Sequence, residues 1–365
     1  MLYSSILKPV LFNMDAEKAH HLIIDGLHTA GKVPGFNGLL NAMYGVAESP
    51  ELTVDLFGLR FPHPVGLAAG LDKNAKAVDS FSNIGLGFAE VGTVTPKGQP
   101  GNELPRLFRL PSDEALINRM GFNNDGAEAM AKQLEGRKVR RIPVAVNIGK
   151  NKVTENEWAH EDYRSCIKVL YAHGDFFVVN ISSPNTPDLR ALQHGDELRT
   201  LLGEVREEMN AQAKIAGKPP KPVLVKIAPD MTDEQLELTV ATIQESGVAG
   251  IIATNTTLSR DGLTHANAGE AGGLSGLPLR QRSTEIIRAI YKQTEGKLPI
   301  IGSGGIFNAS DAYDKIRAGA SLVEIYTSLI YKGPGVLREL TDGLKEKLRK
   351  DGYRSISEAV GADHR

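Results

Sequence analysis

The chain has 365 residues, of which 41% are hydrophobic and 24% charged, and its formal net charge is −2. This composition predicts a globular protein with a large apolar core, and the charge gives no bulk basic signal for nucleic-acid binding. A single cysteine, Cys166, excludes an internal disulfide framework and any cysteine-based metal cluster. In the segment DYRSCIKVLY we expect it to pack as a small apolar residue on a helix.

Residues 1–45 are expected to form a separate helical segment. One apolar stripe at helical spacing comprises Tyr3, Ile6, Leu7, Val10, Leu11 and Met14. Pro9 is tolerated there only in a first turn or at a kink. Asp15 is the predicted N-cap of a second helix, which Gly31 would end. The pattern alone favours a helical pair packed on the main domain over a membrane-surface or apolar-ligand module. No run reaches the ~18 unbroken apolar residues of a membrane-spanning helix.

The rest of the chain alternates between strand-like and helical segments. Residues 52–62, LTVDLFGLRFP, alternate around Gly58 and predict a short hairpin. Helices are predicted at 233–247 and 280–296, among others. Eight β-rich runs follow the hairpin, namely PVGLAAG at 64, FAEVGTV at 88, IPVAVNIG at 142, DFFVVNIS at 175, PVLVKIAP at 222, GIIATNT at 250, LPIIGSGG at 298 and SLVEIYT at 321. This rhythm predicts an α/β (β/α)8 barrel, with a doubly wound open sheet as the alternative.

In such a barrel the functional site lies at the C-terminal ends of the strands. The segments there are AGLDKN, GTVTPK, NIGKNK, NISSPNTPDLR, KIAPD, TNTT, GSGGI and YTS. They lack the paired carboxylates of a glycosidase and the His/Asp/Glu cluster of a metal site, so we predict no metal. Their lysines and asparagines suit an anionic, amide-rich ligand. GSGGI, with GGLSG before it, predicts a phosphate site, against simple chain turning as the alternative.

These segments resemble class 2 dihydroorotate dehydrogenase, a flavin enzyme of pyrimidine biosynthesis, over nearly the whole chain. The resemblance rests on AAGLDKN (68–74), GTVTPKGQPGN (92–102), PRLFRL (105–110), INRMGFNN (117–124), NIGKN (147–151), NISSPNTP (180–187), KIAPD (226–230), ATNTT (253–257), GGLSG (272–276), IIGSGGI (300–306) and YTSLIYKGP (326–334). It implies a TIM barrel at 46–365 and an N-terminal helical extension at 1–45. It also implies that (S)-dihydroorotate is oxidised to orotate through FMN, with a membrane quinone as electron acceptor.

The resemblance also implies roles for individual residues. Ser183 falls on the position of the catalytic base, where the other class has cysteine, and we hypothesise that Thr186 relays its proton. The implied substrate-binding residues are Lys73, Asn118, Arg119, Met120, Gly121, Phe122, Asn180, Asn185, Asn255 and Thr256. The implied FMN-binding residues are Ala69, Gly70, Leu71, Asp72, Lys73, Thr93, Asn147, Asn180, Lys226, Thr254, Gly276, Gly305, Tyr326 and Thr327. His20 and Arg109 match residues that line the quinone tunnel.

The resemblance changes the interpretation of the first 45 residues. They become a membrane-docking, quinone-binding segment, and the expected location is the cytoplasmic face of a bacterial inner membrane, as a peripheral protein. A monomer is expected, and no nucleic-acid partner. Two alternatives stay open: a soluble fumarate- or NAD-linked dihydroorotate dehydrogenase, and a non-catalytic barrel that binds a phosphorylated ligand. Ser183 and the amphipathic extension argue against the soluble enzyme. The combination of Ser183, Lys73 and Lys226 argues against the non-catalytic barrel.

Overall fold

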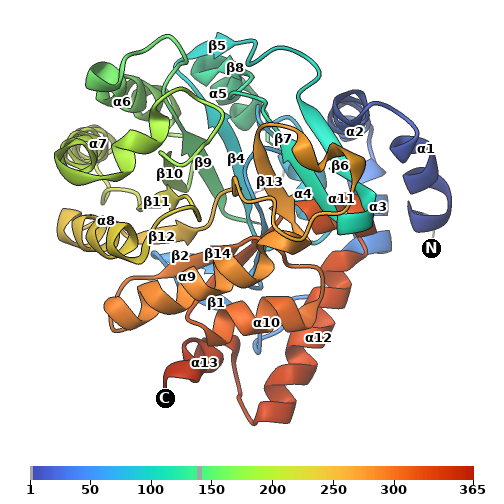
Figure 1. Cartoon of the computed structure of the whole chain (residues 1–365). Helices are drawn as coiled ribbons and strands as arrows, with labels where there is room; N and C mark the ends of the chain where they lie inside the picture. Colours follow the sequence, from blue (N-terminus) through green and yellow to red (C-terminus); the bar gives the residue numbers. More distant parts are fainter. Residues whose placement is uncertain (1–2, 138–141) are drawn as a thin grey trace.

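A closed barrel of eight parallel strands forms the body of the molecule, in a computed structural model that describes residues 3–137 and 142–365 (Figure 1). In chain order its strands are β3 (Val65–Leu67), β4 (Ala89–Val94), β9 (Val144–Ile148), β10 (Phe176–Asn180), β11 (Val223–Ile227), β12 (Gly250–Ala253), β14 (Ile300–Ser303) and β15 (Leu322–Ile325). Each strand pairs with the next, and β15 pairs with β3. All eight predicted runs form strands of this barrel, so the open-sheet alternative is wrong.

Helices cover the outside of the barrel, and one follows each strand (Figure 1). They are α4 (Val78–Asn83), α5 (Ala127–Glu135), α6 (Ala159–Leu170), α7 (Gly195–Ala216), α8 (Asp233–Ser246), α9 (Arg280–Gln293), α10 (Ala309–Arg317) and α12 (Val336–Asp351). Two short helices, α11 (Thr327–Lys332) and α13 (Ile356–Ala359), flank α12. Helices α8 and α9 confirm the two predicted segments, and Cys166 is fully buried on α6 as expected. Because helices cover one strand face and the barrel interior fills the other, every residue of the eight strands is buried.

The predicted hairpin closes the N-terminal end of the barrel. Strands β1 (Val54–Leu56) and β2 (Leu59–Phe61) pair antiparallel. The turn residues Phe57 and Gly58 both have positive φ, 57° and 71°, as two-residue hairpin turns require. The fully buried ring of Phe61 lies 5.5 Å, centroid to centroid, from Phe88 and 6.3 Å from Phe176. Since these two rings stand at the beginning of barrel strands, the opposite end stays open for a site.

Two small antiparallel sheets stand at that opposite end, and we did not predict them. Strands β5 (Lys97–Gln99) and β8 (Asn124–Gly126) form one, and β6 (Leu107–Leu110), β7 (Ala115–Asn118) and β13 (Gly273–Gly276) form the other. Leu110, Ile117 and Leu274 bury a small core of their own here. These strands are three or four residues long and contain loop-like residues, so they carry little periodic signal.

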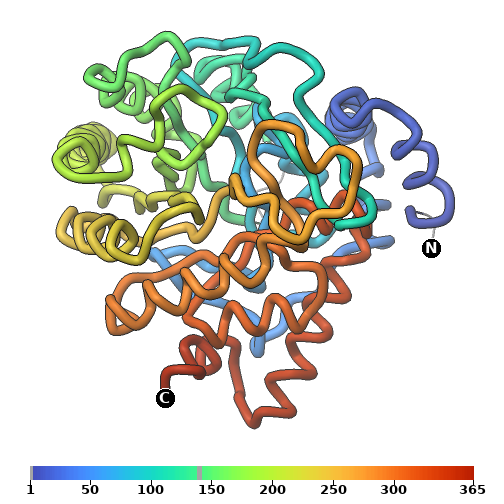
Figure 2. The backbone as a smooth tube through the Cα atoms, in the orientation of Figure 1, coloured from blue at the N-terminus to red at the C-terminus, as the bar shows by residue number. Residues whose placement is uncertain are grey.

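Three helices precede the barrel and lie against one side of it (Figure 1, Figure 2). They are α1 (Lys8–Phe12), which follows a π-helical turn η1 (Tyr3–Leu7), α2 (Ala16–Ala30) and α3 (Phe36–Tyr44). Asp15 caps α2 as predicted, since its carboxylate accepts from the backbone N–H of Glu17 at 3.1 Å and of Lys18 at 2.9 Å. Gly31 follows the last residue of α2, also as predicted.

A buried ion pair fastens α2 to the barrel. The Arg106 guanidinium donates to the Glu17 carboxylate at 2.8, 3.0 and 3.1 Å, and the two side chains are only 10% and 8% exposed. Arg106 also donates to the carbonyl oxygens of Pro100 and Asn102 at 2.6 Å each. Removing one partner of such a pair leaves a buried charge uncompensated, at a cost of roughly 3–5 kcal/mol.

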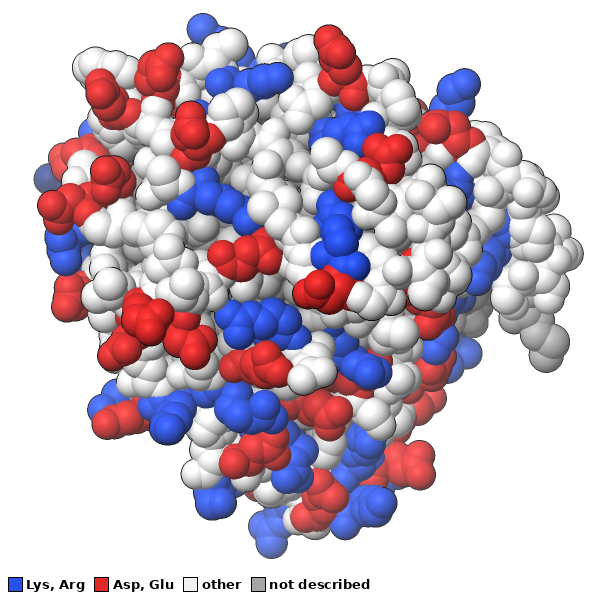
Figure 3. Space-filling view, in the orientation of Figure 1, with Lys and Arg blue, Asp and Glu red and all other residues white. Residues whose placement is uncertain are grey.

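The outer surface of the N-terminal helices is apolar. Large hydrophobic side chains that are 39–60% exposed gather there, namely Ile6, Leu7, Val10, Leu22, Ile23, Val33, Leu39 and Met43. In Figure 3 the lobe at the right, over these helices, is largely free of charged side chains. Exposed apolar surface of this kind is typical of an interaction site. Within residues 3–137 and 142–365, no helix has both the length and the apolar character needed to cross a membrane.

Candidate active site

The main cavity opens at the C-terminal ends of the barrel strands and collects most of the predicted site residues. It contains about 1040 Å³ of atom-free space, part of it open to solvent, which suits a ligand of several rings. The predicted residues that line it are Ala69, Gly70, Lys73, Thr93, Asn118, Met120, Gly121, Phe122, Asn180, Ser183, Asn185, Lys226, Thr254, Asn255, Thr256, Gly276, Gly305, Tyr326 and Thr327. Residues up to 258 positions apart in the sequence thus face one space because the barrel closes.

Lys73 enters this cavity from the loop after β3. Its Nζ donates to the carbonyl oxygen of Gly70 at 2.8 Å. Burial lowers the pKa of Lys73 to about 8, while Glu17 opposes this shift and Arg106 adds to it. A partly desolvated ammonium group gains most from a negative charge brought next to it. Lys73 is therefore suited to bind an anionic group of a ligand.

Three buried ionisable side chains meet inside the barrel. The Lys226 ammonium on β11 lies 2.5 Å from Glu90 Oε2 on β4 and 3.3 Å from Glu324 Oε2 on β15, and Lys226 and Glu324 also line the cavity. Burial by itself would lower the pKa of Lys226, but the Glu324 and Glu90 carboxylates outweigh it and raise that pKa. Burial, then the charge of Glu90, raises the pKa of Glu324 to about 8 against the opposing effect of Lys226. A fixed cation therefore faces the base of the cavity.

The segment NISSPNTPDLR follows β10 and forms one wall. The Ser183 Oγ accepts from the backbone N–H of Asn185 at 3.2 Å, and the Asn185 side-chain amide donates to Asn118 Oδ1 at 3.2 Å. The Thr186 Oγ1 is buried without a hydrogen-bond partner among the residues that the structure describes. A proton relay from Ser183 through Thr186 therefore needs a bridging water.

A second set of amides is held in place by its own hydrogen bonds. The Asn180 amide donates to Thr93 Oγ1 at 2.9 Å and to Asn147 Oδ1 at 3.2 Å. The Asn255 amide donates to Ser182 Oγ at 2.9 Å, and Ser182 donates in turn to Asn180 Oδ1 at 3.0 Å. Because each amide is oriented before a ligand arrives, little ordering entropy remains to be lost on binding.

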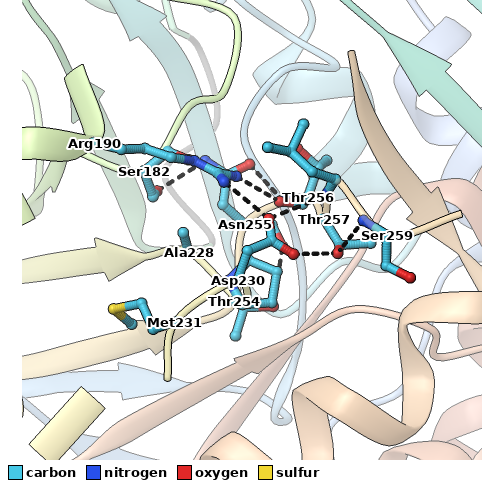
Figure 4. A network of polar contacts seen from close by, with 12 residues as sticks. Ser182, Arg190, Ala228, Asp230, Met231, Thr254, Asn255, Thr256, Thr257 and Ser259 are labelled. Atoms are coloured by element: carbon cyan, nitrogen blue, oxygen red, sulfur yellow. Dashed lines mark hydrogen bonds and ion pairs between the residues drawn. The ribbon is translucent and has the colours of Figure 1, made fainter. Parts of the chain in front are cut away.

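Arg190, the last residue of NISSPNTPDLR, joins three strand-end loops (Figure 4). Its guanidinium donates to the Ser182 carbonyl at 3.0 Å, to Asp230 Oδ2 at 2.9 Å and to the Thr256 carbonyl at 3.1 Å. The Asp230 carboxylate also accepts from the Thr257 hydroxyl. Arg190 thus fixes the backbone next to Ser183 relative to the loops after β11 and β12.

Besides the two predicted quinone-site residues, five predicted site residues do not line the cavity, and their roles stay predictions: Leu71, Asp72, Arg119, Asn147 and Thr186. The fully buried Asp72 accepts from the backbone N–H groups of Lys76 and Ala77 at 2.8 Å each, which organises the loop after β3. Arg119 lies at the rim, where it pairs with Glu270 at 2.7 Å. Asn147 stands behind the lining, fully buried, and donates to Glu90 Oε1 at 2.6 Å.

Comparison with known proteins agrees with this geometry. The family model described as dihydroorotate dehydrogenase matches residues 51–348. The dihydroorotate dehydrogenase (quinone) of Deinococcus deserti is 53% identical over 362 residues, which cover 99% of this chain and 100% of that relative. That of Deinococcus radiodurans is 50% identical over 378 residues, with coverage of 99% and 100%. The chain belongs to the quinone-dependent dihydroorotate dehydrogenase family.

A solved dihydroorotate dehydrogenase has the same fold. The crystal structure of DHODH from Eimeria tenella in complex with ferulenol superposes with a TM-score of 0.88 and 41% identity, over 96% of each chain. Dihydroorotate dehydrogenases of the quinone-dependent class use a flavin, act on dihydroorotate and pass electrons to a quinone. The cavity of this chain fits a flavin, since it has the volume and the buried ammonium of Lys226 at its base.

In this dihydroorotate dehydrogenase the two predicted quinone-site residues lie where the N-terminal helices meet the barrel. His20 on α2 lines a second cavity together with Lys73, and burial, then the charge of Lys73, holds its pKa well below the ordinary value. The Arg109 guanidinium on β6 donates to the Leu11 carbonyl at 2.7 Å and lies 5.0 Å from the ring centroid of Phe12. Both residues stay predictions as quinone ligands.

Sequence reasoning missed part of the lining of the cavity. The additional residues are Ala68, Ser275, Leu279, Ser303, Gly304, Ile306, Phe307, Glu324, Ile325 and Ser328. Glu324 carried a usable signal, because a carboxylate inside the apolar run SLVEIYT is costly unless it is paired or protonated.

Proposed function

We propose that this protein oxidises dihydroorotate to orotate in pyrimidine biosynthesis, with FMN as its flavin and a membrane quinone as electron acceptor. One observation supports it above the others. Lys73, Ser183 and a set of oriented asparagine amides converge on one cavity in a chain of this family. These groups match the chemistry of dihydroorotate. The Lys73 cation suits its carboxylate, the asparagine amides suit its cyclic imide, and the Ser183 hydroxyl suits the proton transfer.

For FMN, we assign Lys226 to the pyrimidine edge of the flavin, where a cation stabilises the negative charge of the reduced ring. Gly276, Gly305 and Thr327 are assigned to the phosphate, because barrels commonly build a phosphate site from the last two strand loops. When bound, FMN supplies the acceptor for the substrate hydride and for the electrons that later leave to the quinone. The other FMN contacts proposed from the resemblance lie on or directly after β3, β4, β9, β10, β12 and β15.

For dihydroorotate, we assign Lys73 to the carboxylate and the amides of Asn118, Asn185 and Asn255 to the ring. Ser183 would take the proton from C5 as the hydride leaves C6, which creates the C5=C6 bond of orotate. The hydroxyl of Ser183 is a weak base, so its proton must pass onward. Thr186, whose buried Oγ1 lacks a partner among the described residues, would accept it through a bridging water.

For the quinone, we assign residues 1–45 to a membrane-docking segment in front of the barrel domain 46–365, with His20 and Arg109 at the inner end of the quinone site. The apolar side chains exposed on α1, α2 and α3 support docking on a membrane surface, and the resemblance implies the cytoplasmic face of a bacterial inner membrane. The protein would then be a peripheral membrane protein, and we propose a monomer.

Anaerobic titration tests the reaction. The purified protein should carry a yellow flavin that dihydroorotate bleaches, and a quinone should restore the colour while fumarate and NAD do not. Failure to bleach would refute the proposed activity. Recovery of the colour with fumarate or NAD would instead place the enzyme with the soluble alternatives.

Vesicle binding tests the docking surface separately. Replacing Val10 and Leu22, which are 60% and 54% exposed, by serine should weaken binding to phospholipid vesicles and slow turnover with a long-chain quinone. The matched control replaces Leu238 on α8, which is 69% exposed on another face, by serine. Bleaching by dihydroorotate should be unchanged in both proteins. Equal vesicle binding by the two proteins would contradict the docking assignment.

A further inference from the structure

The segment GQPGN (98–102) borders the cavity, and the proposed reaction gives it no role. It begins in β5 and runs along the loop 118–122, most of which lines the cavity. A Cβ at Gly101 would lie 2.2 Å from the Met120 carbonyl oxygen, so glycine allows the two segments to approach this closely. The segment is therefore fitted against the loop that carries half of the predicted substrate contacts.

Gln99 holds this loop from outside the cavity. Its side-chain Nε2 donates to the carbonyl oxygens of Gly121 and Phe122 at 3.1 Å each. Its Oε1 accepts from the Asn151 amide at 3.0 Å and from the Lys152 backbone N–H at 2.9 Å, which fixes the orientation of the Gln99 amide. Both donor bonds of Gln99 thus go to the one loop 118–122.

Asn102 differs from Gln99 because its side-chain amide bridges two loops. Its Nδ2 donates to the Arg119 carbonyl at 3.0 Å and to the Asn185 carbonyl, 83 positions away, at 3.1 Å. Its Oδ1 accepts from the Lys152 ammonium at 3.0 Å. An ammonium can only donate, so Nδ2 is the atom that faces the two carbonyls. The backbone N–H of Asn102 adds a bond to the Met120 carbonyl at 3.0 Å.

The bond to Asn185 lies two residues beyond Ser183. Among the described residues outside 180–190, Asn102 is the only donor to a backbone carbonyl of residues 183–187. Asn102 does not belong to the described lining of the cavity, so it acts on a ligand only through the two loops. The amide of Asn102 therefore ties the backbone next to Ser183 to the loop 118–122.

We propose that Asn102 is a positioning residue, which sets the distance between the Ser183 hydroxyl and a substrate held by the loop 118–122. This inference rests on the proposed function, in which Ser183 takes the C5 proton of dihydroorotate. Proton transfer needs hydrogen-bond distance between the base and the proton that it takes. A displacement of about 1 Å between reacting groups can slow a reaction roughly 100-fold, so a single bridging amide has a large effect here.

Loss of the bridge should slow the reaction more than it weakens binding. In the isosteric Asn102→Asp, a carboxylate oxygen replaces Nδ2 and repels both carbonyls. The loop 118–122 keeps its bonds from Gln99 and from the backbone N–H of residue 102, whereas the Asn185 carbonyl loses its bond from this segment. We expect flavin reduction at saturating dihydroorotate to slow roughly 10–100-fold. The dissociation constant of orotate should rise less than about fivefold, as for one weakened hydrogen bond.

Gln99→Met is the matched comparison, and it should show the opposite pattern. It removes the two bonds to Gly121 and Phe122 but keeps the bridge from Asn102, so the substrate loop and the Ser183 loop stay in register. We expect the dissociation constant of orotate to rise about tenfold and the saturating rate of flavin reduction to fall less than the affinity. Both quantities are measured anaerobically, by stopped-flow bleaching of the flavin and by titration with orotate.

Dihydroorotate deuterated at C5 or at C6 gives a readout that loss of stability would not change. Because the C5 proton transfer loses its geometry in Asn102→Asp, the C5 isotope effect on flavin reduction should rise relative to the C6 effect. Equal losses in rate and affinity, an unchanged ratio of isotope effects, or a rate within about threefold of wild type would overturn the proposal. If Asn102→Asp does not fold, Asn102→Ala, which removes the donor without adding charge, decides by the same criteria. A wild-type protein that dihydroorotate does not bleach would instead overturn the proposed function, and this inference with it.

Discussion

Replacing Lys73 tests whether the cavity binds its ligand through a desolvated cation. Lys73 lies in the cavity wall, where its Nζ donates to the Gly70 carbonyl at 2.8 Å, and burial lowers the pKa of Lys73 to about 8. The charged form is therefore the one that is lost as the pH rises through 8. An anionic ligand binds the charged form, so its affinity should follow the charged fraction of Lys73.

The size of the effect follows from the pKa. With a value of about 8, roughly 90% of Lys73 is charged at pH 7 and roughly 9% at pH 9. The dissociation constant of orotate should thus rise about tenfold between these pH values. Lys73→Met should weaken orotate binding at pH 7 by roughly 2 kcal/mol, or about 30-fold, because a close ion pair is lost, and should abolish the pH dependence.

Orotate binding can be followed through the change in the flavin absorption spectrum. Because Glu324 also titrates near pH 8, the titrations are made in the Glu324→Gln background. Among the described residues that line the main cavity, Lys73 is then the group whose pKa lies in this range. Lys73→Arg is the matched control, since arginine stays charged at pH 9. A dissociation constant that does not change between pH 7 and pH 9 with lysine present would refute the reasoning, and so would an unchanged pH dependence in Lys73→Met.

Three further predictions concern other parts of the chain. Ser183→Ala should slow flavin reduction by dihydroorotate roughly 10²–10⁴-fold in single-turnover experiments, as expected for loss of a general base, while orotate affinity changes little; a rate within threefold of wild type would exclude Ser183 as the base. Arg190→Met should slow flavin reduction roughly 100-fold, because it releases the loop that carries Ser183, and it should affect orotate affinity less. Equal losses in rate and affinity would indicate general disruption instead. Arg106→Met should lower the free energy of unfolding by roughly 3–5 kcal/mol, since the buried Glu17 would lose its guanidinium partner and keep the half-exposed His21 imidazole at 3.6 Å beside it. Adding Glu17→Leu should restore much of this loss in denaturant titrations, and additive losses in the double variant would contradict the ion-pair account.

Much of the fold could be predicted because its signals are local. Each barrel strand is mainly apolar, since a parallel strand covered by helices is buried on both faces. The hairpin turn at Gly58 and the helix cap at Asp15 depend on the conformation and hydrogen bonding of a few neighbouring residues. The strand-end segments could be identified as site loops because a barrel places the ends of all its strands at one rim.

The tertiary structure alone decided the contacts between distant charged and polar groups. Glu17 and Arg106 are 89 positions apart, and Glu90 and Lys226 are 136 apart. No periodic pattern indicates which acid meets which base, because that depends on strand order, register and barrel closure. The small sheet of β6, β7 and β13 was missed for the same reason, since β13 pairs with a strand more than 150 residues earlier. Residue type and local spacing therefore determined the barrel and the polar character of its rim. Closure of the barrel decided which residues form ion pairs, which exchange protons and which face the same ligand.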